Sequence, residues 1–497
     1  MSLRRATTTV VCLGAVAATF LGAQAAASPP RVGHPRASNA AAVKVPKLTG
    51  WSQLSSRGVP SISVPGIVQD GAGAQVVWRQ DDTSLTESLR TRKVSGAGRV
   101  TTALGTIVSG WSSLNDDPDL VDLPSGRLAV FAGMRSTSPS EKYDGAMYFS
   151  TSTNHGGTWS LGNGSLSETT SAGSYGSSVI NDGGEPLVAT IASSSSYITL
   201  HRGISPIPAT SGDWTTSKSP LCCAYSVSLG QDSASGNVWA LWNSNSNKSS
   251  QRGVIAAKVY PTPVTNQQQA PSSLTKGNFD PEVVQPVPAA SRRGGGVWTA
   301  YKVGYPTANR IRLWKVGTKQ GFFIKAPDAS MVTLAPGLNG RMWVAWWQNS
   351  KSRVHVARTN PAVTRIGPVR SIKPPTKKGL STSIYSMAAV GMGGGLHLAI
   401  NAAPGFGSSQ IWYQKIAPAL LVSATPARIN AGKVTVRVSD AGQPIAGARV
   451  RFLGAAKLTN KKGVAVFRVK PSVHGGNYLV TGAKNGYAKG SDRVRVT

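Results

Sequence analysis

The six histidines are the first residues to consider for chemistry, because imidazole binds metals and transfers protons near neutral pH. They stand at positions 34, 155, 201, 355, 397 and 474. None of these spacings matches a zinc site, and the sequence contains no His-Glu-x-x-His, no Gly-x-Ser-x-Gly and no phosphate-binding glycine loop that opens a helix. The sequence therefore argues against a metallohydrolase, a serine hydrolase and a nucleotide enzyme, and we predict no metal and no cofactor.

Two of the three cysteines, Cys222 and Cys223, are adjacent, and the third, Cys12, lies in an apolar N-terminal stretch. Adjacent cysteines cannot build a long-range disulfide framework, so the core must supply the stability. Cys222 and Cys223 either close a vicinal disulfide that stiffens a loop, or they remain two buried thiols that act as small hydrophobic residues.

The composition excludes two classes of chain. With 55 Gly and 31 Pro against only five Glu, the 497-residue sequence is unsuited to a helix bundle. A hydrophobic content of 40% with 13 Trp and 12 Tyr does not fit a disordered chain. We therefore expect a globular, β-rich protein.

The N-terminus has the layout of a secretory signal peptide. Arg4 and Arg5 precede an apolar run over residues 10–21 and small residues over 23–27, so we predict a signal peptide over 1–27 and a linker over 28–47. No later window offers 18 uninterrupted apolar residues, so no membrane span is expected. The mature protein is predicted to be secreted, and we expect a monomer.

The charge is strongly positive, with 53 Lys and Arg against 20 Asp and Glu, a net charge of +33. Residues 48–417 carry 33 minus 18, or +15, and residues 418–497 carry 14 minus 2, or +12. Such a field attracts polyanions. Because export is predicted, we expect an extracellular glycan or an anionic cell-envelope polysaccharide as the partner rather than nucleic acid.

A short apolar strand recurs seven times behind a glycine-rich turn, and a second alternating strand follows it. From Val77 to His397 the six steps span 320 residues, about 53 per step. A period of this size with about four short strands per unit is typical of a β-propeller blade. We predict an all-β fold with a β-propeller over 48–417 that has seven blades, or alternatively six. The recurring strands cover residues 74–78, 127–131, 186–190, 238–242, 297–301, 342–346 and 396–400.

After Pro418 the pattern changes to strictly alternating strands separated by Gly- and Pro-bearing turns, which predicts a small β-sandwich over 418–497. Its turns at 440–448, 459–463 and 484–487 resemble those of bacterial Ig-like and carboxypeptidase-regulatory-like modules. That resemblance implies a spacer or an adhesive appendage.

One eight-residue stretch, 152–159, is Ser-Thr-Asn-His-Gly-Gly-Thr-Trp. It resembles the Asp-box (BNR repeat) of the sialidase superfamily of propellers, with Asn154 where Asp is usual. Asn keeps the side-chain acceptor that caps the turn. The resemblance implies a structural role, away from the active face, for Ser152, Asn154, Gly156, Thr158 and Trp159.

The order of other segments is also similar to a sialidase. The resemblance places Asp81 or Asp82 near the acid/base Asp, Arg310 near an arginine that binds the substrate carboxylate, and Tyr385 in the segment of the nucleophilic Tyr. A bidentate guanidinium suits a carboxylate. Arg79 is a further candidate contact of this type, and Trp242 and Trp347 are candidates to stack on sugar rings.

The sequence also departs from the family. Ser63 stands where the family has its first arginine, no Glu accompanies the 222–227 segment, and Asn243 replaces another arginine. Three hypotheses follow: a secreted glycan-binding protein with an incomplete catalytic set, an active exo-glycosidase of sialidase type, and a module that binds cell-envelope polymers through charge alone. Whether the chain is an enzyme stays open; if it is, we expect a glycoside hydrolase.

Overall fold

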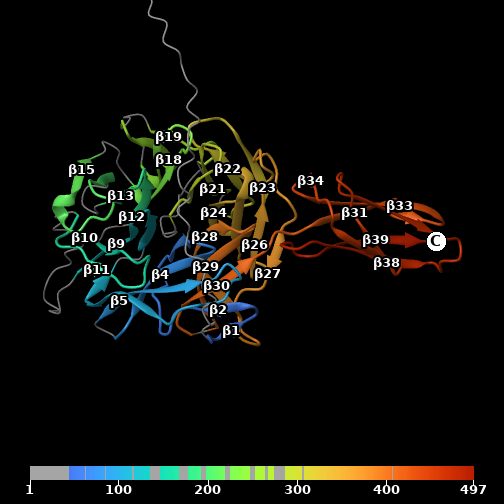
Figure 1. Ribbon diagram of the computed structural model, residues 1–497, viewed down its shortest axis with the longest axis horizontal. Coiled ribbons are helices and arrows are strands. Elements are labelled where there is room, and N and C mark those ends of the chain that lie inside the picture. Colours follow the sequence, from blue (N-terminus) through green and yellow to red (C-terminus); the bar gives the residue numbers. More distant parts are fainter. Residues whose placement is uncertain are drawn as a thin grey trace, which may run out of the picture. The chain divides into compact units, whose positions relative to one another are not determined.

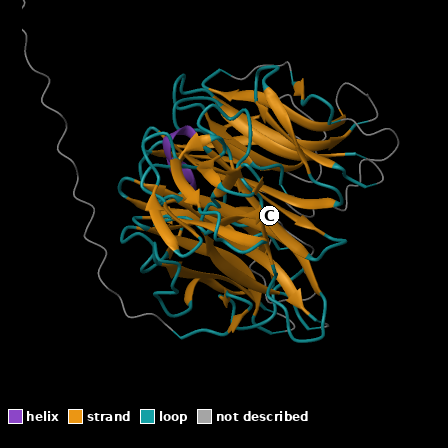
Figure 2. Ribbon diagram, turned by 90° about the vertical axis from the view of Figure 1, so that its right-hand side faces the viewer, coloured by secondary structure: helices purple, strands orange, loops and turns teal. Residues whose placement is uncertain are grey.

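The computed structural model describes residues 44–497, except for 62, 84–85, 115–116, 135–145, 167–176, 192–197, 219–223, 247–251, 263–266, 274–285, 305–306 and 406. The described chain is built of β-strands joined by turns, with two short 3-10 turns, η1 (Ser211–Asp213) and η3 (Leu338–Gly340) (Figure 2). The prediction of an all-β fold is confirmed.

Within residues 47–416 the described strands form seven antiparallel sheets of four or five strands each (Figure 1). The first three sheets contain β3 (Gly66–Asp70), β4 (Gly73–Asp81), β5 (Glu87–Val94) and β6 (Gly105–Trp111); β7 (Ser113–Leu114), β8 (Asp119–Leu123), β9 (Gly126–Met134), β10 (Ala146–Ser152) and β11 (Ser160–Leu161); and β12 (Ser177–Asp182), β13 (Glu185–Ile191), β14 (Ile198–Gly203) and β15 (Trp214–Lys218). The next three contain β16 (Ala224–Gln231), β17 (Val238–Asn245), β18 (Arg252–Tyr260) and β19 (Gln268–Gln269); β20 (Ala289–Ser291), β21 (Val297–Val303), β22 (Arg310–Lys315) and β23 (Gly321–Lys325); and β24 (Ala329–Pro336), β25 (Met342–Gln348), β26 (Arg353–Arg358) and β27 (Arg370–Ile372). The seventh sheet contains β1 (Lys47–Leu48), β2 (Trp51–Gln53), β28 (Thr382–Met392), β29 (Gly395–Pro404) and β30 (Gln410–Ile416).

The sheets follow one another around a ring. One strand of each sheet contacts the corresponding strand of the next, in the order β3, β8, β12, β16, β20, β24 and β28, and β28 contacts β3 again. We call this strand the first of its sheet and count the others from it through the ladder, as in β8, β9, β10, β11 and β28, β29, β30, β2. The last sheet combines both ends of this region, since β2 pairs with β30 through Ser52 opposite Tyr413 and Gln53 opposite Trp412 (Figure 1). This closure covers sheet edges that would otherwise be exposed, and it is consistent with a β-propeller.

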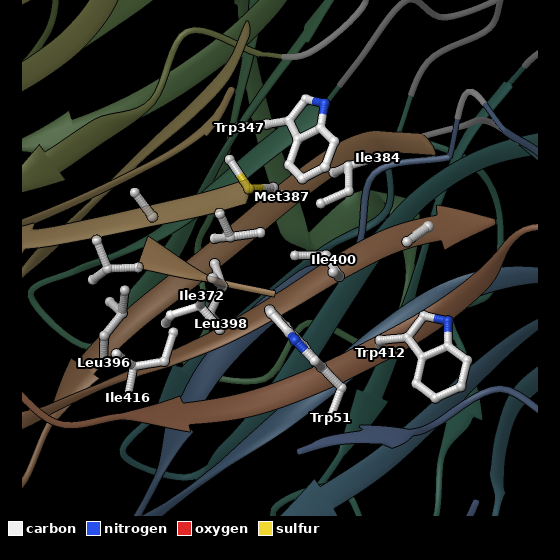
Figure 3. Close-up of a cluster of buried hydrophobic side chains, with 14 of the residues drawn as sticks. Trp51, Trp347, Ile372, Ile384, Met387, Leu396, Leu398, Ile400, Trp412 and Ile416 are labelled. Atoms are coloured by element: carbon white, nitrogen blue, oxygen red, sulfur yellow. The ribbon is translucent and has the colours of Figure 1, made fainter. Parts of the chain in front are cut away.

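The second strand of each sheet lies between neighbouring sheets, which explains the apolar repeat of the sequence. Every residue of β25 and of β29 is buried. A strand buried on both faces has a nearly continuous apolar run in place of an alternating pattern. Figure 3 shows one resulting core cluster, in which Trp51 from β2 packs with Leu398 and Ile400 from β29.

Antiparallel pairing gives each sheet two opposite ends. The turns after the first and third strands lie at one end, which we call the Asn154 end because the β10–β11 turn carries Asn154. The loops after the second and fourth strands lie at the other, which we call the Asp81 end because β4 finishes there at Asp81. The two ends therefore collect different segments of the chain.

After the ring, the described strands form two further sheets with their own core, which includes Val434, Val450 and Phe467. Asp440 at the end of β33 is 1% exposed and forms ion pairs with Arg341 (3.3 Å) and with Arg358. The strands of this region are β31 (Leu421–Thr425), β32 (Arg428–Ile429), β33 (Gly432–Asp440), β34 (Gln443–Pro444), β35 (Arg449–Phe452), β36 (Ala455–Leu458), β37 (Val464–Val469), β38 (Gly476–Ala483) and β39 (Gly490–Val496).

Candidate functional site

The loop before β3 connects the two segments that the resemblance assigned to catalysis. Its Ser63 carbonyl accepts hydrogen bonds from Ser386 Oγ (2.7 Å) and Asn401 Nδ2 (2.9 Å), which come from β28 and β29. On its other side, the amide of Asp81 donates to the carbonyl of Gly58 (3.2 Å). The loop is thus bonded to the end of β4 through Gly58 and to the β28 segment that carries Tyr385 through Ser63.

Asp82 is held as a charged carboxylate. Its Oδ1 accepts a hydrogen bond from Arg90 Nη2 at 2.8 Å, and the Arg57 guanidinium donates to its carbonyl oxygen. Partial burial alone would raise the pKa of Asp82, but the hydrogen bonds from Arg90 and Ser88 outweigh it, so the pKa lies below its usual value. Asp82 is therefore a persistent hydrogen-bond acceptor at this end of the ring.

The pKa of Asp81 is shifted in the opposite direction, upward. A Cβ built on Gly58 would lie 4.0 Å from Asp81 Oδ2, so the carboxyl group lies against the loop backbone. Burial raises the pKa of Asp81; the positive charge of Arg79 partly opposes this shift and the charge of Asp82 adds to it. Two neighbouring carboxyl groups with pKa values shifted apart are the pattern expected of one proton donor and one permanent acceptor.

Glu87 completes this carboxyl cluster, and the sequence reasoning missed it. It lies directly opposite Asp81 in the β4–β5 ladder, and its side chain forms an ion pair with Arg79 at 2.5 Å. Burial raises the pKa of Glu87, although Arg79 and the amide of Leu114 partly counteract it. The register of the hairpin was the available signal, because Asp81 and Glu87 flank the same short loop. The pairing also means that the Arg79 guanidinium is engaged within the protein.

Tyr385 projects from an irregularity in its strand. The pairing of β28 with β29 shifts between Ile384 and Ser386, and Tyr385 falls in this β-bulge. Its two neighbours are buried, whereas Tyr385 is 36% exposed. A bulge that turns a side chain out of the ladder often occurs beside a functional site.

Three candidate contacts lie elsewhere. Arg310 begins β22 in another sheet, and its guanidinium carbon stacks 4.2 Å from the Phe323 ring centroid. Trp242 is 0% exposed within the core, and Trp347 is 3% exposed and packs beside Ile384 and Met387 (Figure 3). The expectation that Trp242 and Trp347 stack on a sugar does not fit this burial, because the apolar central strands use both indoles as core.

The Asn154 end contains a hydrogen-bonded turn. Asn154 Oδ1 accepts bonds from the amides of Gly157 (2.9 Å) and Thr158 (2.8 Å) and from Ser152 Oγ (2.9 Å), and Ser152 Oγ in turn accepts the amide of Gly156 (2.7 Å). Gly156 has a φ of 87°, and a Cβ there would lie 2.2 Å from Gln75 Oε1. Only glycine fits this close approach.

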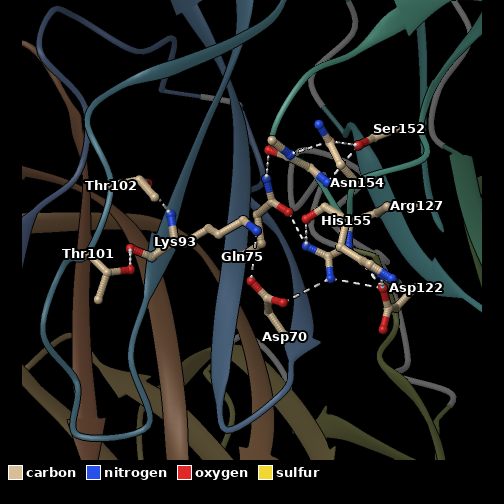
Figure 4. Close-up of polar contacts among 12 residues, drawn as sticks. Asp70, Gln75, Lys93, Thr101, Thr102, Asp122, Arg127, Ser152, Asn154 and His155 are labelled. Carbon is tan, nitrogen blue, oxygen red and sulfur yellow. Dashed lines mark hydrogen bonds and ion pairs between the residues drawn. The ribbon is translucent and has the colours of Figure 1, made fainter. Parts of the chain in front are cut away.

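Arg127 ties this turn to the neighbouring sheet (Figure 4). Its side chain is 1% exposed and donates to the His155 carbonyl (2.9 Å) and to Gln75 Oε1. It also pairs with Asp122 (2.8 Å) and with Asp70 (3.3 Å). The guanidinium therefore has partners on two sheets.

Cys222 and Cys223 lie outside the described residues. Over the part of the chain that is described, no three His, Cys, Asp or Glu side chains gather in a way that could hold a metal ion. Within the same part, no helix has the length and apolarity needed to cross a membrane.

No protein-family model matches the chain, and no curated protein is similar to it in sequence. Among solved structures, a polysaccharide lyase is 9% identical with a TM-score of 0.42 over 73% of this chain and 90% of that chain. A Hadza microbial sialidase is 8% identical with a TM-score of 0.42, over 71% of this chain and 65% of that chain. The sialidase of Trypanosoma rangeli is 10% identical with a TM-score of 0.42, over 76% and 60%. At such low identities and TM-scores, none of these similarities assigns an activity or a substrate to this chain.

Proposed function

We propose that the ring is a seven-bladed β-propeller over residues 48–417, followed by an Ig-like β-sandwich over 418–497, in a secreted protein. Each of the seven sheets corresponds to one blade under this proposal, and the pairing of β2 with β30 fastens the ring. The turn at Asn154 corresponds to the Asp-box of related propellers, because Asn154 Oδ1 accepts the bonds that a carboxylate would accept there.

We propose further that the Asp81 end binds a glycan. The single observation that supports this proposal is that one loop is hydrogen-bonded both to the amide of Asp81, next to Asp82, and to Ser386, next to the exposed Tyr385. Sugar hydroxyls donate hydrogen bonds to carboxylates, and the apolar faces of a pyranose pack on aromatic rings.

The preferred glycan is neutral in this proposal. A carboxylate-bearing sugar needs guanidinium partners, yet Ser63 is 0% exposed, Arg79 pairs with Glu87, and Arg310 stacks on Phe323. A clamp for an anionic sugar is therefore incomplete among the described residues.

The test is a glycan array probed with the purified protein at physiological salt and at several-fold higher salt. Binding to a defined neutral terminal sugar that survives the added salt is the expected result. Asp82→Asn and Tyr385→Ala should weaken this binding about tenfold, or about 1.4 kcal/mol. Arg310→Gln is the matched control and should leave it unchanged. Failure to retain any neutral glycan would refute the proposal.

A second candidate, an exo-glycosidase, is favoured by the raised pKa of Asp81. A carboxyl group that keeps its proton to higher pH can protonate a leaving-group oxygen, while Glu87 supplies a second carboxyl group beside it. Hydrolysis of a panel of aryl glycosides at pH 4 to 8, abolished in Asp81→Asn, would support it. The absence of turnover across the panel would leave the binding function alone.

A further inference from the structure

The outer face of one C-terminal sheet displays five exposed arginines. The sheet has the strand order β32, β39, β38, β35 and β36. Along its strands Val450, Val480 and Val494 are 0% exposed and pack into the core, so the alternate residues lie on the opposite face. The residues of that face include Arg428, Arg449, Arg451, Arg493 and Arg495, which we call the arginine face.

The ladder confirms that these side chains share one side of the sheet. Arg451 is paired with Thr481, Leu479 with Arg493, and Asn477 with Arg495. Residues that are register partners point to the same face, and so do residues two apart on one strand. Arg449 and Arg451 are therefore about 7 Å apart along β35. The register places Ser491 across from Arg451, so Arg493 lies two strands across and two residues along, about 12 Å from Arg451, and Arg495 lies about 17 Å from it.

Nothing within the module neutralises this face. Residues 418–497 contain 14 Lys and Arg but only two acids, Asp440 and Asp492. Asp440 is buried, and the Asp492 carboxylate accepts the amides of Ala424 and Arg493, each at 2.8 Å. Asp492 is also opposite Val480 in the ladder and so belongs to the inner face. Over the described residues no ion pair is found for the five arginines.

The placement of these charges lowers the stability of the sheet, and the fold does not require it. Arg428 and Arg495 are direct register partners on adjacent strands, and like charges in that position destabilise a sheet. Exposed Leu458 (67%) and Leu479 (55%) lie beside the arginines on the same face. A sheet face with exposed cations and apolar side chains between them fits a ligand that has repeated anions on a partly apolar backbone.

We propose that the arginine face binds an extended anionic polysaccharide. Guanidinium groups form bidentate bonds with carboxylate, sulfate and phosphate groups alike, so the shared chemistry is a repeated oxyanion. A single-stranded nucleic acid fits less well, because its bases need aromatic platforms. Tyr478 lies on the inner register opposite Val494 and donates its hydroxyl to the His474 carbonyl (2.8 Å). This surface is separate from the Asp81 end and does not depend on the function proposed there.

The test measures binding of the full chain to dextran sulfate, polygalacturonate, poly(glycerol phosphate), neutral dextran and single-stranded DNA. The variant replaces Arg449, Arg451, Arg493 and Arg495 by Gln. The matched control replaces Lys461, Lys462, Lys470 and Lys484 by Gln, which removes the same charge from exposed turns of the same module. Thermal unfolding of each variant checks that the module still folds.

We expect the protein to bind at least one anionic polysaccharide, with the arginine variant at least tenfold weaker and the lysine control within about twofold. The sulfate, carboxylate and phosphate arms identify the preferred oxyanion. Equal loss in both variants would show attraction by net charge alone and overturn the proposal, as would no binding or binding only to DNA. Asp82→Asn should leave this binding unchanged, so a failure here is distinguishable from a failure at the Asp81 end.

Discussion

The two ends of the ring both concentrate charged residues, but they use them differently. At the Asn154 end, Arg127 is 1% exposed and has partners on two sheets, and its acidic neighbours Asp70 and Asp122 are engaged by it. At the Asp81 end, the carboxyl group of Asp82 is no more exposed than these two, but the pKa values of Asp81 and Asp82 are shifted in opposite directions. A polar cluster built around a buried guanidinium with several partners stabilises the fold, whereas neighbouring carboxyl groups with unlike protonation tendencies are suited to a ligand.

The histidines extend this contrast. His201 and His397, each 1% exposed, lie in the halves of their strands toward the Asn154 end. His201 contacts the hydroxyl groups of Thr190 (3.2 Å) and Thr216 (3.1 Å), and His397 contacts Tyr413 Oη (2.6 Å). Burial lowers the pKa of each histidine to about 4. These groups are neutral parts of the core and not proton donors of a site.

The largest expected effect is therefore acid destabilisation at the Asn154 end. Below pH 6.5 the unfolded histidines bind protons that the folded ones do not, so stability falls as the pH drops from about 6.5 to about 4 and then levels off. Each histidine contributes up to about 3 kcal/mol over this window. Guanidinium unfolding at several pH values measures the slope.

The variants His201→Gln and His397→Gln test whether the two buried histidines cause the acid destabilisation. Each should reduce the pH dependence of the unfolding free energy between pH 6.5 and 4, whatever its effect at neutral pH. His474→Gln, at an exposed position, is the control and should leave the slope unchanged. An unchanged slope in both buried-site variants would mean that other groups cause the acid sensitivity.

Replacing Arg127 tests whether the charged residues at the Asn154 end stabilise the fold. Arg127→Met removes the donor for Gln75 and the His155 carbonyl, takes the guanidinium from Asp122 and leaves Asp70 with Lys93 alone, so we expect a loss of about 3 kcal/mol in unfolding free energy. Arg310→Met, at an exposed arginine that stacks on Phe323, should cost below about 1 kcal/mol. Equal losses would contradict a structural assignment of the Asn154 end. The measurement is guanidinium unfolding at neutral pH.

The sequence was sufficient for much of the fold because its signals are local. The recurring apolar strands coincide with the buried second strands of the sheets; Trp78, Trp298 and Trp343, for example, lie in β4, β21 and β25. Composition alone excluded a helical protein. The closure of the ring through β2 and β30 joins residues more than 350 positions apart, and no local pattern specifies such a pairing.

The candidate site was only partly predictable. Asp81, Asp82 and Tyr385 came from a resemblance in segment order, and the loop before β3 does join their segments. Glu87 was missed because its role depends on register, which places it opposite Asp81. Trp242 and Trp347 were proposed as ligand contacts because aromatic type does not reveal whether a ring lies in the core or at the surface.

The Asp81 end should show its own pH dependence in glycan binding. An ionised carboxylate accepts the bonds of sugar hydroxyls more strongly than a protonated carboxyl group does. Because the pKa of Asp81 is raised, binding should weaken as the pH falls toward that raised value, before Asp82 protonates. We expect about a tenfold loss, or about 1.4 kcal/mol. Titration of the affinity from pH 7 to pH 4 measures it. Asp81→Asn should flatten this step, and a step of the same size in that variant would assign it to another group.

The smallest expected effect concerns the turn that carries Asn154. Asn154→Ala removes the acceptor shared by Ser152, Gly157 and Thr158, but the turn is exposed and water replaces part of what is lost, so we expect about 1 kcal/mol less stability. Asn154→Asp keeps the acceptor and loses only the amide donor to Thr158 Oγ1 (3.0 Å), so it should stay close to the parent protein. The measurement is the unfolding free energy of the parent protein and of the two Asn154 variants. If Asn154→Asp lost as much stability as Asn154→Ala, the side-chain amide donor would be the essential group of the turn. The turn would then not be equivalent to one capped by a carboxylate.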